Sequence, residues 1–383
     1  MILPRNILLT PGPATTSVRV KQAQVVADIC PREIDFGRLQ ASIGERLVEI
    51  VHGQGTHEAV LFAGSGTCAV EACISSLMPP SGRILVMVNG AYGARIREMC
   101  RLHLRPDQVV LSEVGFDEVP DIGAIGRMLA ADRTITHVVA VHHETTTGVL
   151  NPVEALSRTT AALGVTLIVD AMSSYAGIPI DLRESPFDFL ISSSNKCLQG
   201  MAGISFVIGR STLLTPPPDH RPRSLYLDLY AQHRGFRDTL QMRFTPPVQV
   251  LYALDAALDE YFEETGAERH ARYSRCWDTL VHGMQEIGFA LAVPDLPQSK
   301  LLTTFLSPRH PRFSFAAMHD ALLAEGFTIY PGKVGEIDCF RLANIGAIDV
   351  PDIVAFLRAL RLYLKTQSID LKSTERTPLV KVS

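Results

Sequence analysis

The chain has 383 residues, with 36 basic and 40 acidic side chains and a hydrophobic fraction of 46%. This length predicts about two or three domains, and the high hydrophobic fraction excludes a wholly disordered chain. The net charge of -4 gives no indication of a nucleic-acid partner or of binding to an anionic membrane surface.

The cysteines and the N-terminus bear on the cellular compartment. Seven cysteines without CxxC spacing argue against a disulfide framework or a structural zinc site, and they favour free thiols in a reducing compartment. The first residues lack the charged start and long apolar stretch of a signal peptide, and no apolar run approaches the ~20 residues that span a bilayer. We therefore expect a cytoplasmic protein without a membrane partner.

Short apolar runs alternate with longer amphipathic or alanine-rich stretches over residues 58–210. This alternation is typical of an α/β protein with a mostly parallel sheet that helices cover on both faces. The expected strands are 59–62, 83–88, 108–111, 137–142, 166–169, 189–192 and 204–208, and the expected helices are 66–78, 90–102, 121–131 and 153–163.

The pattern changes in the second half of the chain. After a proline-rich connector at 215–223, apolar residues recur at helical spacing, which predicts a long helical stretch from about 247 to 286. The polar, aperiodic end of the chain predicts a loose tail. Between them we expect a smaller α/β unit with its elements at 302–306, 314–325, 328–330, 339–342 and 349–365.

A glycine-rich turn, Gly64-Ser65-Gly66-Thr67, lies between the first expected strand and the helix after it. Glycine lets the backbone approach a ligand closely, and the free N–H groups at a helix N-terminus bind phosphate well. The turn matches neither the P-loop pattern nor GxGxxG, and glycine-rich turns between strand and helix are common. Taken alone, it is either a phosphate site or an ordinary turn.

Two further residues follow apolar strands. Asp170 ends the strand at 166–169, and Lys196 follows the strand at 189–192 within a run of small polar residues. Ligands of open α/β sheets bind at this carboxyl edge, and a lysine amine can form a Schiff base with an aldehyde. The alternatives are a helix-capping aspartate and a surface lysine.

Together, the three features predict one cofactor. A phosphate cradle, a carboxylate and a lysine at one sheet edge are the groups that pyridoxal phosphate requires, because it carries a phosphate, a pyridine nitrogen and an aldehyde. The sequence therefore predicts pyridoxal 5'-phosphate as the cofactor.

These residues belong to longer stretches through which the chain resembles the class V aminotransferases of fold type I, from about residue 6 to 360. LTPGP and the Asp–Lys pair are general to the class, whereas DICPRE, ETTTG and SSSNKC are typical of its phosphonate branch. The resemblance implies a mostly parallel seven-stranded sheet, a smaller C-terminal α/β domain and a homodimer with shared active sites. The matching stretches are 8–13, 28–33, 64–67, 89–93, 143–148, 170–174 and 192–197.

The resemblance also implies a division of the chain. Residues 1–20 contribute to the active site and to the small domain, and residues 21–250 form the large domain that binds pyridoxal phosphate. Residues 251–365 form a long linking helix and the small C-terminal domain, and residues 366–383 form a flexible tail.

For the cofactor, the resemblance implies individual roles. Lys196 forms the Schiff base and transfers the proton during the reaction, and Asp170 pairs with the pyridine nitrogen. Tyr92 stacks on the ring, although an ordinary core tyrosine is the alternative, and Thr145 bonds near the 3-oxygen of the ring. The residues implied to bind the phosphate are Ser65, Gly66, Thr67 and Ser193, with Thr245 of the neighbouring subunit.

For the substrates, the phosphonate branch implies transfer of an amino group from 2-aminoethylphosphonate to pyruvate by a ping-pong mechanism. The products are phosphonoacetaldehyde and L-alanine. Arg341 is the candidate for the substrate anions, because a guanidinium binds a carboxylate or phosphonate through two parallel hydrogen bonds; the alternative is a structural ion pair. Thr10 and Gly12 are implied to lie at the substrate, and Arg32 and Arg95 are further candidates for anion contacts.

Other functions stay open at this point. One is another class V activity, such as alanine–glyoxylate or serine–pyruvate transamination. Another is a carrier or regulator that binds pyridoxal phosphate without turnover, although no basic helical module for DNA binding is visible. His142 and His143 end a strand without the carboxylate or cysteine spacing of a metal site, so we expect no metal. Tyr175 stands where the family usually has an apolar aromatic residue, which bears on the choice of amino donor.

Overall fold

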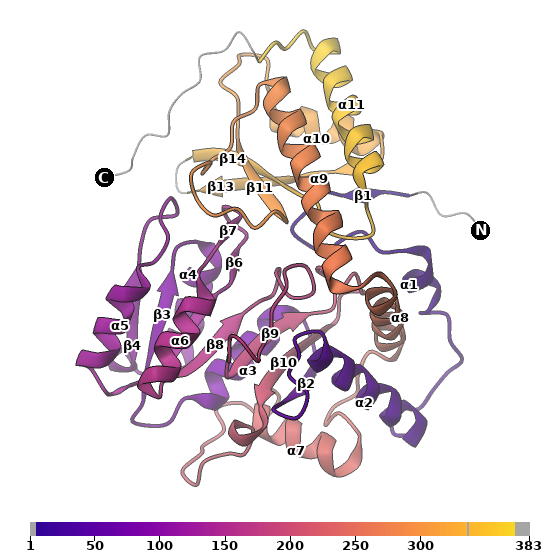
Figure 1. Cartoon of the computed structure of the whole chain (residues 1–383). Helices are drawn as coiled ribbons and strands as arrows, with labels where there is room; N and C mark the ends of the chain where they lie inside the picture. The colour runs from indigo at the N-terminus through magenta and orange to yellow at the C-terminus, as the bar shows by residue number, and fades with distance from the viewer. Residues whose placement is uncertain (1–4, 335–336, 372–383) are drawn as a thin grey trace.

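The computed structural model describes residues 5–334 and 337–371. Figure 1 shows a large sheet surrounded by helices, with a smaller sheet and helices α9, α10 and α11 beyond its edge. The large sheet has seven strands in the order β2-β10-β9-β8-β5-β3-β4, and only β10 runs antiparallel to its neighbours. This confirms the predicted seven-stranded, mostly parallel sheet. Its strands are β2 (His57–Ala63), β3 (Arg83–Val88), β4 (Val109–Glu113), β5 (Ile135–Val141), β8 (Thr166–Asp170), β9 (Phe189–Ser193) and β10 (Ile204–Arg210).

Helices cover both faces of this sheet, which is why its strands are continuous apolar runs. In β3, Leu85 and Met87 belong to the core shared with α2, α5, α6 and α8, whereas Ile84, Val86 and Val88 belong to the core shared with α3, α4 and α7. The helices are α2 (Ile34–Glu49), α3 (Gly66–Leu77), α4 (Ala91–His103), α5 (Ile122–Ala131), α6 (Val153–Leu163), α7 (Leu229–Thr239) and α8 (Val248–Glu264).

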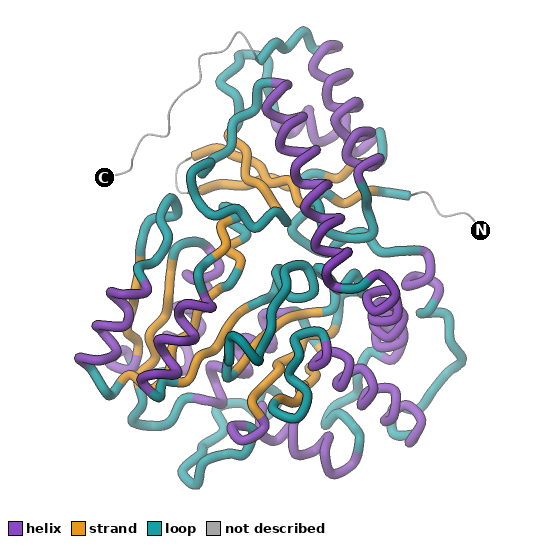
Figure 2. The backbone as a smooth tube through the Cα atoms, viewed as in Figure 1, coloured by secondary structure: helices purple, strands orange, loops and turns teal. Residues whose placement is uncertain are grey.

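The register of the parallel strands brings their carboxyl ends together. Asp170, the last residue of β8, pairs with Val141 of β5 on one side and with Ile191 of β9 on the other. The loops that follow these strands lie between the two sheets, as Figure 2 shows. The sheet therefore presents loop residues from several segments at one edge.

The smaller sheet is antiparallel, with the order β11-β14-β13. The N-terminal strand β1 (Ile7–Leu8) pairs with β12 (Phe327–Thr328) beside it, so the N-terminal segment joins the C-terminal part of the fold. The strands are β11 (Leu302–Leu306), β13 (Tyr330–Val334) and β14 (Ile337–Ala343), and the helices are α9 (Gly266–Ile287), α10 (Phe315–Ala324) and α11 (Val350–Thr366).

Four details differ from the sequence-based expectations. The helical stretch expected from 247 to 286 is two helices, because Thr265 adopts a left-handed φ of 71° between α8 and α9. The strand expected at 328–330 is divided between β12 and β13. Ile369 and Leu371 of the expected tail are buried, and residues 372–383 lie outside the described residues. Unpredicted elements are α1 (Val18–Gln22), α2, α7, β1, β6 (His143–Glu144) and β7 (Val149–Leu150).

Within the described part of the chain, no helix has the length and apolar character that crossing a bilayer requires.

Candidate active site

A cavity of about 380 Å³ lies at the carboxyl edge of the large sheet. Its walls come from the loops after β2, β5, β8 and β9, from the start of α4 and from the N-terminal segment. The structure therefore brings together residues that are far apart in sequence. The predicted site residues that line the cavity are Ser65, Gly66, Thr67, Tyr92, Thr145, Asp170, Ser193 and Lys196.

Lys196 lies in the turn after β9, and its amine is directed into the cavity. Its Nζ donates a hydrogen bond to the carbonyl oxygen of Pro11 over 3.0 Å. Gly12 has a φ of 134°, and a Cβ there would lie 2.0 Å from this nitrogen, so only glycine allows the approach. Burial lowers the pKa of Lys196, and the charge of Arg95 lowers it further. A lowered pKa increases the fraction of neutral, nucleophilic amine.

Asp170 ends β8 and is only 6% exposed. Its Oδ1 accepts a hydrogen bond from the backbone N–H of Met172 over 2.9 Å. Burial and the nearby carboxylate of Glu144 raise the pKa of Asp170 to about 6, against the Met172 hydrogen bond and the charges of Arg95 and Lys196. At neutral pH most of this carboxyl group is ionised, so the cavity contains a buried negative charge.

The start of α3 provides the predicted phosphate cradle. Ser65 is the N-cap residue, yet its side chain makes no capping hydrogen bond, and the first turn contains no acidic residue. Free N–H groups and an unengaged hydroxyl at a helix N-terminus favour an anion. A Cβ at Gly66 would lie 2.2 Å from Sδ of Met172, so a larger residue there would displace the Met172 side chain, which packs on this turn from the Asp170 loop.

Arg341 lies on β14 and does not line the cavity itself, but it contacts Thr145, which does. Its Nη1 donates to the carbonyl oxygen of Thr145 over 3.3 Å, and its guanidinium lies 4.8 Å from the centre of the Tyr330 ring. Among the residues that the structure describes, its buried Nε has no hydrogen-bond partner. The guanidinium therefore has donor capacity left for a ligand. Arg95, at the start of α4, stacks at 4.9 Å over Tyr92 and also lines the cavity.

Three other candidates lie away from the cavity. Thr10 is buried and donates to the carbonyl oxygen of Pro13 over 3.1 Å. Arg32 donates to the carbonyl oxygen of Met242 over 2.7 Å and to its neighbours rather than toward the cavity. Thr245 is exposed on the surface of the chain.

The sequence assigned no role at the site to His143 or to its neighbour Glu144. His143 lines the cavity, where its Nδ1 lies 3.0 Å from Oγ of Ser173 and its Nε2 lies 2.8 Å from Oγ of Ser299. Burial lowers the pKa of His143 to about 3, so the ring is neutral. The buried carboxylate of Glu144 accepts the N–H of Gly93 over 3.4 Å and so holds the start of α4. The polar residues directly after β5 indicated that His143 and Glu144 lie at the carboxyl edge of the sheet. They did not indicate which residues these two side chains contact.

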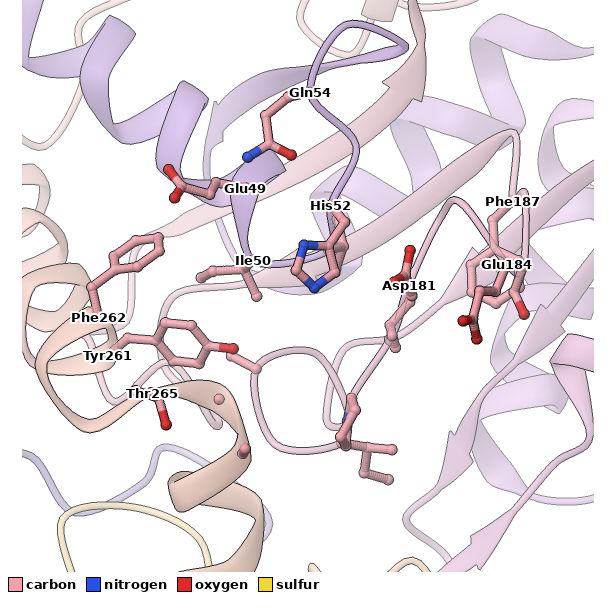
Figure 3. A pocket seen from close by; sticks show the side chains of 18 of the residues that line it. Glu49, Ile50, His52, Gln54, Asp181, Glu184, Phe187, Tyr261, Phe262 and Thr265 are labelled. Atoms are coloured by element: carbon pink, nitrogen blue, oxygen red, sulfur yellow. The ribbon is translucent and has the colours of Figure 1, made fainter.

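A larger cavity, of about 570 Å³, lies elsewhere (Figure 3). It lies among the end of α2, residues 176–187 and the junction of α8 with α9, where Tyr261 and Thr265 are found. Its walls include the side chains of His52 and Asp181 but no lysine and none of the predicted site residues. The chemistry therefore belongs to the smaller cavity.

The smaller cavity fits pyridoxal phosphate. The helix start at Ser65 suits the phosphate, the buried carboxylate of Asp170 suits a protonated pyridine nitrogen, and the amine of Lys196 suits the aldehyde. Ser65, Asp170 and Lys196 line the same cavity. The side chain of Ser65 makes no capping hydrogen bond to its own helix, so it can bind the phosphate. These residues would hold the cofactor.

Comparisons of the fold agree with this assignment. An alanine–glyoxylate aminotransferase from Nostoc sp. superposes with a TM-score of 0.86 at 25% identity, covering 95% of this chain and 96% of that chain. A ureidoglycine–glyoxylate aminotransferase from Bacillus subtilis also gives a TM-score of 0.86, at 21% identity, covering 98% of this chain and 96% of that chain. The predicted fold type I architecture is confirmed.

Comparisons of the sequence define the family. A 2-aminoethylphosphonate–pyruvate transaminase from Pseudomonas aeruginosa is 44% identical over 349 residues, which cover 91% of this chain and 93% of that protein. A protein of the same name from Pseudomonas putida is 40% identical, covering 95% of this chain and 98% of its own length. Residues 36–319 match the family model of the class V aminotransferases. This chain is therefore a member of the class V aminotransferase family.

Proposed function

We propose that this protein transfers the amino group of 2-aminoethylphosphonate to pyruvate, which gives phosphonoacetaldehyde and L-alanine. The observation that carries the proposal is the 40–44% identity to transaminases of this name over nearly the whole chain. The class V family uses pyridoxal phosphate, and the cavity at Lys196 and Asp170 supplies groups that suit it. When bound, the cofactor supplies an electron sink for the electrons released at the substrate carbon.

Each side chain that lines the cavity has its own role in the proposed reaction. Lys196 holds the cofactor covalently and moves a proton at its Nζ, for which a lowered pKa is suitable. Asp170 holds the proton on the pyridine nitrogen through its buried charge. Tyr92 and Thr145 line the cavity and would hold the ring of the cofactor. The phosphate is bound by Ser65, Gly66, Thr67 and Ser193.

Arg341 binds the anionic group of each substrate in turn. Its unpartnered Nε and its position beside Thr145 support this role. The phosphonate of the donor and the carboxylate of pyruvate each offer two oxygens to a planar guanidinium. Because one arginine serves both halves of the reaction, the two substrates bind alternately, as a ping-pong mechanism requires.

The function is tested by measuring alanine formation from pyruvate over a panel of amino donors. We expect 2-aminoethylphosphonate to be the best donor, ahead of serine and of alanine with glyoxylate as acceptor. Arg341→Ala is expected to raise the KM for 2-aminoethylphosphonate and for pyruvate by about tenfold to a hundredfold, the scale of hydrogen bonds to a charged group.

Arg312→Ala provides the control, because this arginine is exposed and donates to Ser368 far from the cavity. Preference for serine or for the alanine–glyoxylate pair would replace the proposed function by another class V activity. An unchanged KM for both substrates in Arg341→Ala would remove this arginine from the site.

We also propose a homodimer in which each chain completes the site of the other. Large apolar side chains are exposed next to the segment that carries Thr245: Leu225 is 75% exposed and Tyr226 is 38% exposed. The Tyr226 ring stacks on Phe244 with ring centres 5.1 Å apart, and its hydroxyl donates to the carbonyl oxygen of Ala63 over 2.8 Å. This apolar patch therefore adjoins the phosphate turn, and Thr245 lies beside it.

Mixing two inactive variants tests the shared site. Lys196→Ala removes the lysine, and Thr245→Glu places a negative charge against the phosphate of the partner's cofactor. In a mixed dimer of these two variants, one site carries both changes and the other carries neither. We expect alanine formation to return on mixing, with a sedimentation mass of two chains. A monomeric mass, or no recovery after the chains have exchanged, would contradict the shared site.

The remaining proposals concern organisation and location. We propose that residues 21–250 form the cofactor domain and that residues 251–365 form the smaller domain, to which residues 1–20 contribute. Pairing of β1 with β12 supports the last assignment. We propose a cytoplasmic location, since all seven cysteines are free thiols, which a reducing compartment favours.

A further inference from the structure

Tyr273 of α9 is fully buried, and its hydroxyl lies between two loops of the active site. Nε2 of Gln199 lies 2.7 Å from the hydroxyl oxygen, and the backbone nitrogen of Gly346 lies 3.1 Å from it. Gln199 belongs to the turn that contains Lys196, and Gly346 follows β14, which contains Arg341. A single oxygen atom therefore connects the turn that contains Lys196 with the turn that follows β14.

On the lysine side, the connection holds an unusual backbone. Gln199 has a φ of 65°, a left-handed conformation that residues other than glycine adopt rarely. Its backbone N–H donates to the carbonyl oxygen of Lys196 over 2.9 Å, which closes the turn. The hydrogen bond from its side chain to Tyr273 is a tertiary contact that favours this conformation, so the path of the backbone at Lys196 depends on it.

On the arginine side, Tyr273 contacts the turn that follows β14. The carbonyl oxygen of Tyr273 accepts the side-chain N–H of Asn344 over 2.9 Å, while its hydroxyl accepts from Gly346. Gly346 also pairs with Thr15 of the N-terminal segment. The end of β14 is thus held against α9 through both the main chain and the side chain of one tyrosine.

A second bridge runs beside the first and starts at Glu264. Its carboxylate accepts Nε of Arg269 over 2.7 Å and Nε of Arg272 over 2.6 Å. Arg269, which is 1% exposed, donates to the carbonyl oxygen of Cys197 over 3.0 Å, and Arg272 donates to that of Gly346 over 3.0 Å. Figure 1 shows α9 running from the junction with α8 toward the small sheet. The helix therefore contacts both loops twice.

We propose that Tyr273 is a positioning residue that sets the separation between Lys196 and Arg341. The tyrosine contacts neither cofactor nor substrate; it acts through Gln199 on one loop and Gly346 on the other. The inference rests on the proposed function for the tasks of Lys196 and Arg341. The bridge itself is a property of the chain without cofactor, and it can be measured there.

The test is Tyr273→Phe, which removes the bridging oxygen and keeps the ring. In the chain without cofactor, we expect hydrogen–deuterium exchange to become about tenfold faster in residues 195–200 and 344–347, as the loss of a buried hydrogen bond predicts. In the loaded enzyme, the KM for both substrates is expected to rise about tenfold. Tyr363→Phe is the matched control, because Tyr363 is also buried but lies on α11, outside both loops.

A second variant, Gln199→Asn, shortens one side of the bridge and keeps a residue type that tolerates left-handed backbone. If the two residues act through one contact, the double variant loses no more than Tyr273→Phe alone. Unchanged exchange in either segment overturns the proposal, and so does a lower melting temperature with unchanged KM values. If Tyr273→Phe does not fold, the same readouts of Gln199→Asn decide. The two proposals can fail separately. If exchange becomes faster in Tyr273→Phe but the wild type does not use 2-aminoethylphosphonate, the bridge is supported and the proposed function is refuted.

Discussion

Replacing Lys196 with alanine is expected to lower the rate of alanine formation by at least about 10⁴-fold, since the variant loses both covalent attachment and proton transfer. No other lysine lines the cavity among the described residues, so no second amine is available there. Steady-state assays with 2-aminoethylphosphonate and pyruvate measure the loss. Borohydride reduction of the loaded wild type, followed by peptide mapping, is expected to find the cofactor on the peptide that contains Lys196.

Lys365→Ala is the control for both measurements, because this lysine is exposed at the end of α11. It is expected to keep full turnover and the same labelled peptide. If Lys196→Ala kept turnover near that of the wild type, another base would perform the proton transfer. A label on a different peptide would displace Lys196 as the attachment site.

Replacing Asp170 with asparagine is expected to have two opposite effects. Turnover falls by about 10³-fold or more, because the neutral amide no longer stabilises a protonated pyridine nitrogen. The chain without cofactor becomes more stable at pH 8, because the buried charge is gone. The folded pKa of about 6 lies above the ordinary value of 3.8, so the folded chain loses stability from this group as pH rises from about 4 through 6. That shift corresponds to about 3 kcal/mol above pH 7.

Urea unfolding of the chain without cofactor measures this effect. The gain of Asp170→Asn over the wild type is expected to be large at pH 8 and small at pH 4, where the wild-type carboxyl group is protonated. Asp181→Asn is the control. The hydrogen bond from Arg183 lowers the pKa of Asp181 to about 2, so this variant is expected to be less stable than the wild type at pH 8. A less stable Asp170→Asn chain at pH 8 would show that the buried charge is compensated.

The large sheet could be predicted because its strands are buried on both faces. Burial on both faces makes each strand a continuous apolar run, and all seven runs were recognisable without any tertiary information. The same sheet explains the success with Asp170 and Lys196. Parallel strands place their carboxyl ends at one edge, so residues that follow neighbouring strands meet there whatever the intervening chain does.

What could not be predicted depends on contacts between distant residues. The position of Ser299 beside His143 joins positions that no local pattern relates. The break at Thr265 is similar, because the apolar spacing continues across it while a single left-handed residue redirects the helix. The contact of Arg341 with Thr145 arises because β14 lies beside the loop that follows β6. Periodicity reports on one element at a time, so it contains no information on such contacts.

The N-terminal segment has a consequence for biosynthesis. The backbone N–H of Ala14 donates to the carbonyl oxygen of Asn195 over 3.0 Å, and the carbonyl oxygen of Leu9 accepts the N–H of Ala343 over 3.1 Å. On the ribosome, the first of these contacts can form once the large sheet has emerged, whereas Leu9 waits for nearly the last part of the chain. All the residues that line the cavity lie between Pro11 and Gly203, so they are synthesised before β14, and only the anchoring of Leu9 waits for Ala343.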